Sequence, residues 1–108
     1  MQVNKTVYYT KLLDIYGNML TPKQHAILTD YLCFDNTLSE IAQAHKTTRQ
    51  AVKDIINRTC LKLDEFEQKL HYSAKTQQLL VDLKQILAKD ISKEVKAKIE
   101  QIIKSMEV

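Results

Sequence analysis

Apolar residues recur along this chain at the three- and four-residue spacing of amphipathic α-helices, and the pattern restarts several times. The first stretch predicts a helix from Asn4 to about Tyr16, with charged residues away from its centre. Gly17 follows directly, and we expect it to end the helix in the left-handed conformation that glycine adopts freely. The apolar stripe of this helix consists of Val7, Tyr8, Leu12, Ile15 and Tyr16.

A second helix is expected immediately afterwards. Thr21 is a suitable N-cap, Pro22 suits the first helical position, and Gln24 completes a capping box three residues after the cap. The apolar positions that follow predict that this helix ends near Cys33 or Phe34.

Two helical patterns separated by a short turn occupy residues 38–63 and predict a helix-turn-helix. The first helix should cover residues 38–45, and Thr37 with Glu40 forms a capping box in front of it. The second helix should begin after Thr48, whose hydroxyl can accept a bond from the free amides of the first turn.

Small and branched apolar residues define the predicted contact between these two helices. Ile41 and Ala42 supply the inner face of the first helix, and the small Ala42 allows close approach. Val52 and Ile55, three residues apart, supply the inner face of the second helix.

The second helix does not stop where a minimal helix-turn-helix would. Its inward face continues to Leu70, for about five turns, and the helical phase is then lost over residues 71–73. We expect a kink or short break there, followed by a helix to about Lys89 and a last helix capped by Ser92. The short connection predicts that these two helices form an antiparallel hairpin.

The chain is therefore expected to have a helix-turn-helix domain over residues 1–70 and a C-terminal helical hairpin over residues 71–108. A hairpin of this size cannot bury much apolar surface by itself. It should pack against a second copy, as a dimerisation arm, or fold back on its own monomer.

Composition narrows the fold class and the cellular location. One Gly and one Pro among 108 residues are too few for turn-rich β structure, so an all-α fold is favoured. No stretch approaches the roughly 18 apolar residues that span a bilayer, so no membrane insertion is expected. The N-terminus lacks the basic-then-apolar order of a signal peptide, which indicates a cytoplasmic protein.

Positive charge gathers on the second helix of the helix-turn-helix. The net charge is only +3, and residues 1–37 contain equal numbers of lysines and aspartates. Residues 48–62, in contrast, contain Arg49, Lys53, Arg58 and Lys62 against Asp54 alone. A DNA-reading helix needs this concentration of charge, although a solvated helix face would explain the charge equally well.

The sequence contains no catalytic motif, cofactor-binding motif or metal-binding motif. It has no glycine-rich phosphate loop, nucleophile motif or paired carboxylates near a histidine. Cys33 and Cys60 are far apart and are expected to be small buried residues, and the three histidines are scattered. We therefore expect a protein that is not an enzyme and needs no metal or cofactor.

The outer face of the helix-turn-helix supplies the candidate binding residues. Four side chains on the second helix could meet base edges or phosphates, and two further cations could contact phosphates only. The first group is Arg49, Gln50, Lys53 and Asn57, and the second is Lys46 and Arg58.

Three segments of the chain together resemble the region 4 helix-turn-helix of bacterial sigma factors. These segments are residues 37–42 (TLSEIA), residues 48–52 (TRQAV) and residues 61–63 (LKL), preceded by LTPKQ at residues 20–24. The resemblance implies an all-α fold of the winged-helix-like superfamily with a C-terminal helical extension. The tyrosine-rich N-terminal helix and the long fourth helix further resemble the YlxM-like family of small bacterial proteins.

That resemblance covers residues 4–70 closely and the C-terminal hairpin only loosely. It implies a helix-turn-helix regulator, or an accessory factor of the signal recognition particle pathway. Members of the family are encoded beside the signal recognition particle protein. Two features depart from the region 4 pattern. Residues 45–47 (HKT) stand where glycine and an apolar residue are usual, and Ala51 and Asp54 stand on the reading face.

Two functional hypotheses follow. The first is a nucleic-acid-binding helix-turn-helix protein, dimeric, that regulates transcription or assists the targeting machinery. The second is a protein-interaction module that binds a signal recognition particle component, its RNA or its GTPase, without sequence-specific DNA binding. Asp54 and the mild net charge favour the second hypothesis, because an acidic side chain repels phosphate.

Overall fold

The computed structural model describes residues 3–107, and these residues are helical apart from turns and short connections. They form two compact units, residues 3–71 and residues 72–107. The described range contains no strand, so the all-α prediction is confirmed. Each unit is considered by itself below.

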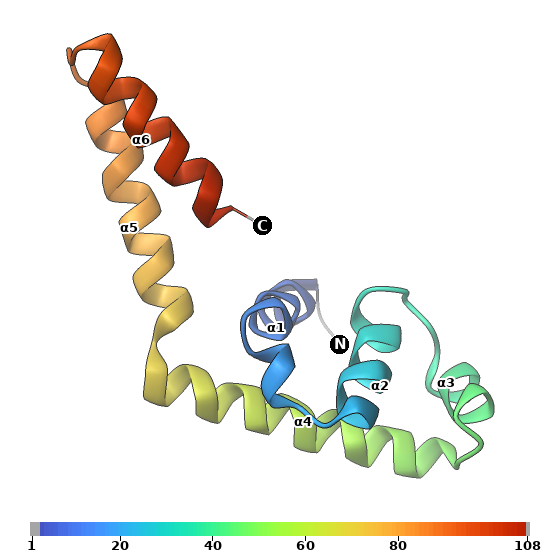
Figure 1. The fold of residues 1–108 in the computed structure, drawn as a ribbon. Helices are drawn as coiled ribbons and strands as arrows, with labels where there is room; N and C mark the ends of the chain where they lie inside the picture. Colours follow the sequence, from blue (N-terminus) through green and yellow to red (C-terminus); the bar gives the residue numbers. More distant parts are fainter. Residues whose placement is uncertain (1–2, 108) are drawn as a thin grey trace. The chain divides into compact units, whose positions relative to one another are not determined.

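The first unit contains four α-helices and one short 3₁₀ turn. Its long last helix runs beneath the other three, as Figure 1 shows, and contacts each of them. The elements are α1 (Val3–Tyr16), η1 (Gly17–Met19), α2 (Pro22–Leu32), α3 (Leu38–Ala44) and α4 (Arg49–Leu70).

The hydroxyl-containing caps fold as the sequence predicts. Thr21 and Gln24 exchange side-chain and backbone hydrogen bonds of 3.2 Å in front of α2. Thr37 and Glu40 form the same reciprocal box at 3.1 Å in front of α3. Thr48 Oγ1 accepts from the backbone N–H of Ala51 at 3.0 Å and begins α4.

Gly17 corrects one prediction. It is not in the left-handed region; instead it begins the 3₁₀ turn that follows α1. The space beside it explains the glycine, because an added Cβ would lie 3.0 Å from the His25 ring. Gly17 therefore allows close approach between η1 and α2, a contact that local sequence does not show.

The core of the first unit is made by one face of α1 together with α2, α3 and α4. Leu12, Leu13 and Tyr16 are the buried residues of α1, and Tyr9 packs against them. The predicted stripe was therefore partly wrong, since Val7, Tyr8 and Ile15 are exposed. The other core residues are Leu20, Ile27, Leu28, Leu32, Ile41, Ala42, Val52, Ile56, Cys60 and Leu63.

The predicted break in the helical phase is confirmed at one residue. His71 adopts φ 51° and separates α4 from α5, without a glycine or proline nearby. A residue with a Cβ costs about 1–2 kcal/mol in this left-handed conformation.

The second unit is a helical hairpin. Helices α5 (Tyr72–Leu87) and α6 (Lys93–Met106) lie side by side, as Figure 1 shows for this unit. Ser92 Oγ caps α6 by accepting from the Val95 N–H at 3.3 Å, as predicted. Only Ile99 and Ile103 are buried among the described residues of the hairpin, and α5 buries none.

Candidate nucleic-acid interface

Helices α3 and α4 pack through small and branched side chains. Ile41 and Val52 are fully buried, and Ala42 is 6 % exposed. Ile56, rather than the predicted Ile55, supplies the second buried position on α4, because Ile55 is only partly buried. The structure thus forms the predicted helix-turn-helix, with Val52 buried as predicted and Ile56 buried more fully than Ile55.

The turn between α3 and α4 is held by backbone bonds. Lys46 adopts φ 53°, and the N–H of Thr47 donates to the Ala42 carbonyl at 2.9 Å. Residues 45–47 stand where the region 4 pattern usually has glycine, and Lys46 is the one that adopts the left-handed conformation. The exposed Lys46 ammonium therefore stands beside the start of α4.

His45 has a structural role that the sequence did not reveal. Its Nε2 lies 3.0 Å from Asp30 Oδ2, so the end of α3 is fastened to α2. The two residues are 15 positions apart in the chain, and no local pattern connects them. This contact fixes the turn that precedes the candidate reading helix.

The candidate binding residues all lie on exposed positions at one end of α4 and in the turn before it. Arg49, Lys53 and Asn57 recur every four residues and form one row along the helix surface. This row, the α4 reading row, contains no carboxylate. The remaining candidates are Lys46, Gln50 and Arg58.

A second row on α4 is less positive. Gln50 Nε2 donates to Asp54 Oδ1 at 3.1 Å, so the amide is engaged by its own helix. Arg58 continues this row one turn later. Since Asp54 opposes phosphate and occupies Gln50, the α4 reading row is the stronger candidate for an anion.

Two carboxylates farther along α4 are bonded to tyrosines of α1. Tyr9 donates its hydroxyl to Asp64 Oδ2 at 2.9 Å, and Tyr16 donates to Glu67 Oε1 at 2.8 Å. Burial, together with the nearby Asp64 carboxylate, raises the pKa of Tyr9 well above its ordinary value of 10.0. The sequence did not show that tyrosines of α1 bind these two carboxylates.

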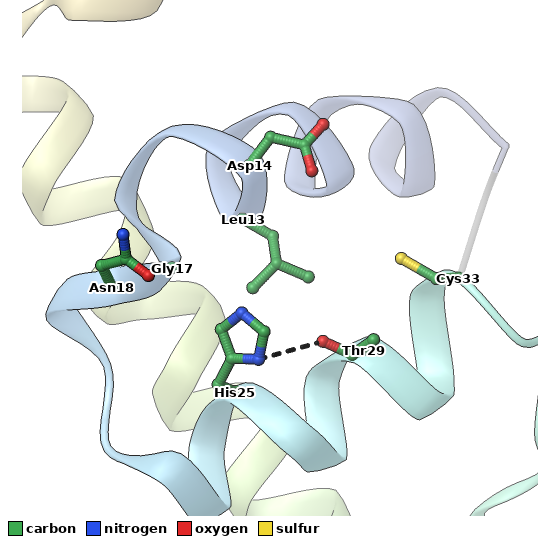
Figure 2. Close-up of a pocket in the computed structure, with 7 residues that line it drawn as sticks. All are labelled: Leu13, Asp14, Gly17, Asn18, His25, Thr29 and Cys33. Atoms are coloured by element: carbon green, nitrogen blue, oxygen red, sulfur yellow. Dashed lines mark hydrogen bonds between the residues drawn. The ribbon is translucent and has the colours of Figure 1, made fainter. Parts of the chain in front are cut away.

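A small hollow between α1 and α2 contains a cysteine, a histidine and an aspartate (Figure 2). Its volume is about 230 Å³. His25 Nδ1 lies 3.4 Å from Thr29 Oγ1, and the described residues show no hydrogen bond that joins His25 to Cys33 or Asp14. Cys33 is exposed, contrary to prediction, whereas Cys60 is buried as expected. The described residues also contain no group of three or more side chains able to hold a metal ion.

No helix within residues 3–107 has the length and apolar character needed to cross a membrane.

The packing of α3 on α4, the turn and the exposed start of α4 define a helix-turn-helix protein. A family model described as "Putative helix-turn-helix protein, YlxM / p13 like" matches residues 3–106. The chain belongs to this family, UPF0122.

Bacterial relatives agree with the family match. A UPF0122 protein of Clostridium perfringens is 39 % identical over 101 residues, which are 85 % of this chain and 90 % of the relative. One of Bacillus mycoides is 37 % identical over 107 residues, or 94 % of this chain and 97 % of the relative. One of Lacticaseibacillus casei is 44 % identical over 77 residues, or 71 % and 68 % of the two chains.

Proposed function

We propose that this protein binds nucleic acid through α3 and α4 and acts as a regulatory or accessory factor of the signal recognition particle pathway. The observation that supports binding is the α4 reading row, which presents Arg49, Lys53 and Asn57 from a capped, well-packed helix end. The pathway itself rests on the family resemblance alone. We also propose a cytoplasmic location.

Each side chain has a proposed role in duplex binding. Arg49, Lys53 and Asn57 reach base edges or phosphates of the major groove, with Gln50 beside them. Lys46 and Arg58 contact phosphates only, because they flank the row rather than continue it. The positive start of α4 adds a favourable dipole for a phosphate.

Salt-titrated fluorescence anisotropy with labelled duplex DNA tests this proposal. Neutralising about four phosphates predicts that log K falls with log salt with a slope near −3.6. The double variant R49A/K53A should bind much more weakly and with a shallower slope. A matched control, K11A/K23A, removes two exposed lysines from α1 and α2 and should retain most of the affinity.

Equal binding by the wild-type protein and R49A/K53A would rule out this face as the interface. The same titration with signal recognition particle RNA compares the two nucleic acids directly.

A second candidate function is a protein-interaction module that contacts a signal recognition particle component. The Gln50–Asp54 hydrogen bond favours it, because it places a carboxylate and an engaged amide on the reading side of α4. A pull-down of the ribonucleoprotein, with and without nuclease, separates the two functions. Retention after nuclease treatment supports contact with the GTPase, and loss supports contact with RNA.

We further propose that residues 71–108 form a dimerisation arm. The hairpin exposes Leu79, Val81, Ile86, Val95 and Ile102 by 38–49 % of their surface. A second hairpin would cover such side chains and complete a four-helix bundle. Light scattering should give a dimer for the wild type and a monomer for L79K, whereas Q77K, an exposed change on the same helix, should remain dimeric.

A further inference from the structure

A groove of about 870 Å³ opens on the first unit between α1 and α4. Helix α4 supplies Ile56 and Cys60, which are 4 % and 7 % exposed and form its floor. Leu38, at the start of α3, is half-buried on its wall. Leu61 on α4 is 63 % exposed, which is unusual for a leucine beside such a floor. We call this hollow the α1–α4 groove.

The ionised side chains of the α1–α4 groove are both cations. Lys5 on α1 and Lys53 on α4 line it, and no aspartate or glutamate belongs to its lining. Asp64 lies close by, but its carboxylate accepts the hydroxyl of Tyr9, which also lines the groove. An apolar floor with two ammonium groups in the lining matches an amphipathic helix whose polar flanks are acidic.

Two other occupants match this surface less well. A hairpin from a second copy carries more cations than carboxylates and would meet Lys5 and Lys53 with the same charge. Its cations are Lys75, Lys84, Lys89, Lys93, Lys96, Lys98 and Lys104, and its carboxylates are Asp82, Asp90, Glu94, Glu100 and Glu107.

Nucleic acid is also a poor match. The floor is apolar, and the two tyrosines of the lining, Tyr9 and Tyr31, are partly buried and pack against the core, so they suit stacking by a base less well than exposed rings do. Tyr9 also packs against Tyr8 in a T-shaped arrangement, with 5.1 Å between the ring centroids. A sugar–phosphate chain in the groove would leave Leu61 against charged oxygens instead of apolar surface.

We propose that the α1–α4 groove binds an acidic amphipathic helix of a partner protein. Its apolar side covers Leu38, Ile56 and Leu61, and its carboxylates approach Lys5 and Lys53. Because Lys53 and Asn57 line the groove and also belong to the α4 reading row, the bound helix and DNA exclude each other. This competition with DNA rests on the proposed function, whereas binding of the helix does not.

The probe is a displayed library of helical peptides with leucines at i, i+3, i+4 and i+7 and with flanking positions randomised among Glu, Gln and Lys. Selection on the full-length protein should enrich peptides rich in Glu. A library that yields no binder, or yields Lys-rich binders, overturns the proposal.

Variants of the protein then test whether the selected peptide binds in the α1–α4 groove. L61D should weaken its binding by roughly tenfold or more, because it replaces an apolar contact with a like charge. K5Q and K53Q should each weaken binding by about threefold to fivefold. I15D and K11Q, matched changes at exposed α1 positions outside the groove lining, should leave binding unchanged. A peptide insensitive to L61D would bind elsewhere and would overturn the proposal.

Competition is measured separately. The selected peptide should displace labelled duplex DNA from the wild-type protein, with an inhibition constant equal to its own Kd. If the protein bound the peptide but no DNA, the proposed function would be wrong, and the proposal that the groove binds an acidic helix would hold. If peptide and DNA bound together, the groove would stand and mutual exclusion would be wrong.

Discussion

Lys46 has φ 53° in the turn between α3 and α4, where a side chain with a Cβ is strained. The same residue is a proposed phosphate contact at the start of the reading helix. Its backbone therefore favours glycine, whereas its ammonium favours binding. Stability and function place opposite demands on this one position.

Replacing Lys46 with glycine should separate these two demands. K46G should raise the free energy of unfolding by about 1 kcal/mol, because the strain is relieved at some cost in chain entropy. The same variant should weaken DNA binding and lower the salt slope by about one unit. Thermal denaturation and anisotropy measure the two effects.

K46Q is the control, since it keeps the strain and removes only the charge. It should match K46G in binding and the wild type in stability. A K46G variant that is less stable than K46Q would contradict the strain argument.

Tyr9 should give the protein a characteristic loss of stability at alkaline pH. Its folded-state pKa is raised, so its contribution is complete below the unfolded value of 10.0 and declines as pH rises beyond it. Y9F should be about 1 kcal/mol less stable at neutral pH, through loss of the bond to Asp64, and should decline less steeply above pH 10. Urea denaturation between pH 7 and about pH 11 measures both.

Ionisation of the Cys60 thiol contributes to the loss of stability at alkaline pH in both proteins. Burial, then Asp64, raises the pKa of its thiol to about 11 from 9.0, so stability also falls above pH 9 in both proteins. Only the difference between the wild type and Y9F reports on Tyr9. Y72F, at a tyrosine that is 58 % exposed, should show the wild-type decline.

The sequence predicted those residues whose partners are close in the chain. Thr21 and Thr37 cap their helices through residues three positions away, so residue types at a fixed spacing were enough to identify both caps. The bonds from His45 to Asp30 and from Tyr9 to Asp64 span 15 and 55 positions. Their geometry depends on how whole helices pack, which residue spacing does not determine.

At the scale of the element, α4 combines several roles. Its inner face closes the core, its first turns carry the α4 reading row, and its later turns hold the tyrosines of α1. The sequence predicted the length of this helix and a kink or short break within residues 71–73, where the structure ends α4 at His71. It placed Ile55 beside Val52 on the inner face, whereas the structure buries Ile56 more fully than Ile55, because neighbouring β-branched residues leave the phase of a stripe uncertain by one position.

The N-cap of α4 should matter most at the reading end. T48A removes the oxygen that accepts from the Ala51 N–H, and it should cost about 1 kcal/mol of stability. Hydrogen exchange should accelerate at the first-turn amides of α4 more than at Leu63. DNA affinity should fall as well, because Arg49 lies in the frayed turn.

T48S retains the capping oxygen and should restore slow exchange and affinity together. Unchanged exchange in T48A would show that the cap does not hold this helix end.

At the scale of the whole molecule, the core of the first unit is complete without the hairpin. Every residue of that hydrophobic core lies before His71. The sequence predicted both the helix-turn-helix and the hairpin from their periodicity. Periodicity does not identify the surface that covers the apolar face of the hairpin, because it describes each helix and not what packs against it.

A fragment of residues 1–71 should therefore fold by itself. Its amide spectrum should overlay that of the same residues in the full-length protein, and its unfolding should remain cooperative. If the hairpin is the dimerisation arm, the fragment should be monomeric and should bind duplex DNA more weakly, through loss of the second contact site. An unfolded fragment, or a dimeric one, would contradict this division of roles.

The two tyrosine bonds between α1 and α4 have a geometric consequence. Tyr9 and Tyr16 are about 10.5 Å apart along α1, whereas their acceptors Asp64 and Glu67 are about 4.5 Å apart along α4. Two attachments with unequal spacing do not fit parallel rods, so they set a crossing angle and prevent either helix from rolling or sliding. A one-residue slip of α4 would turn its surface by about 100°. The orientation of Arg49, Lys53 and Asn57 is thus set at the opposite end of their helix, by the hydroxyl groups of Tyr9 and Tyr16 on α1.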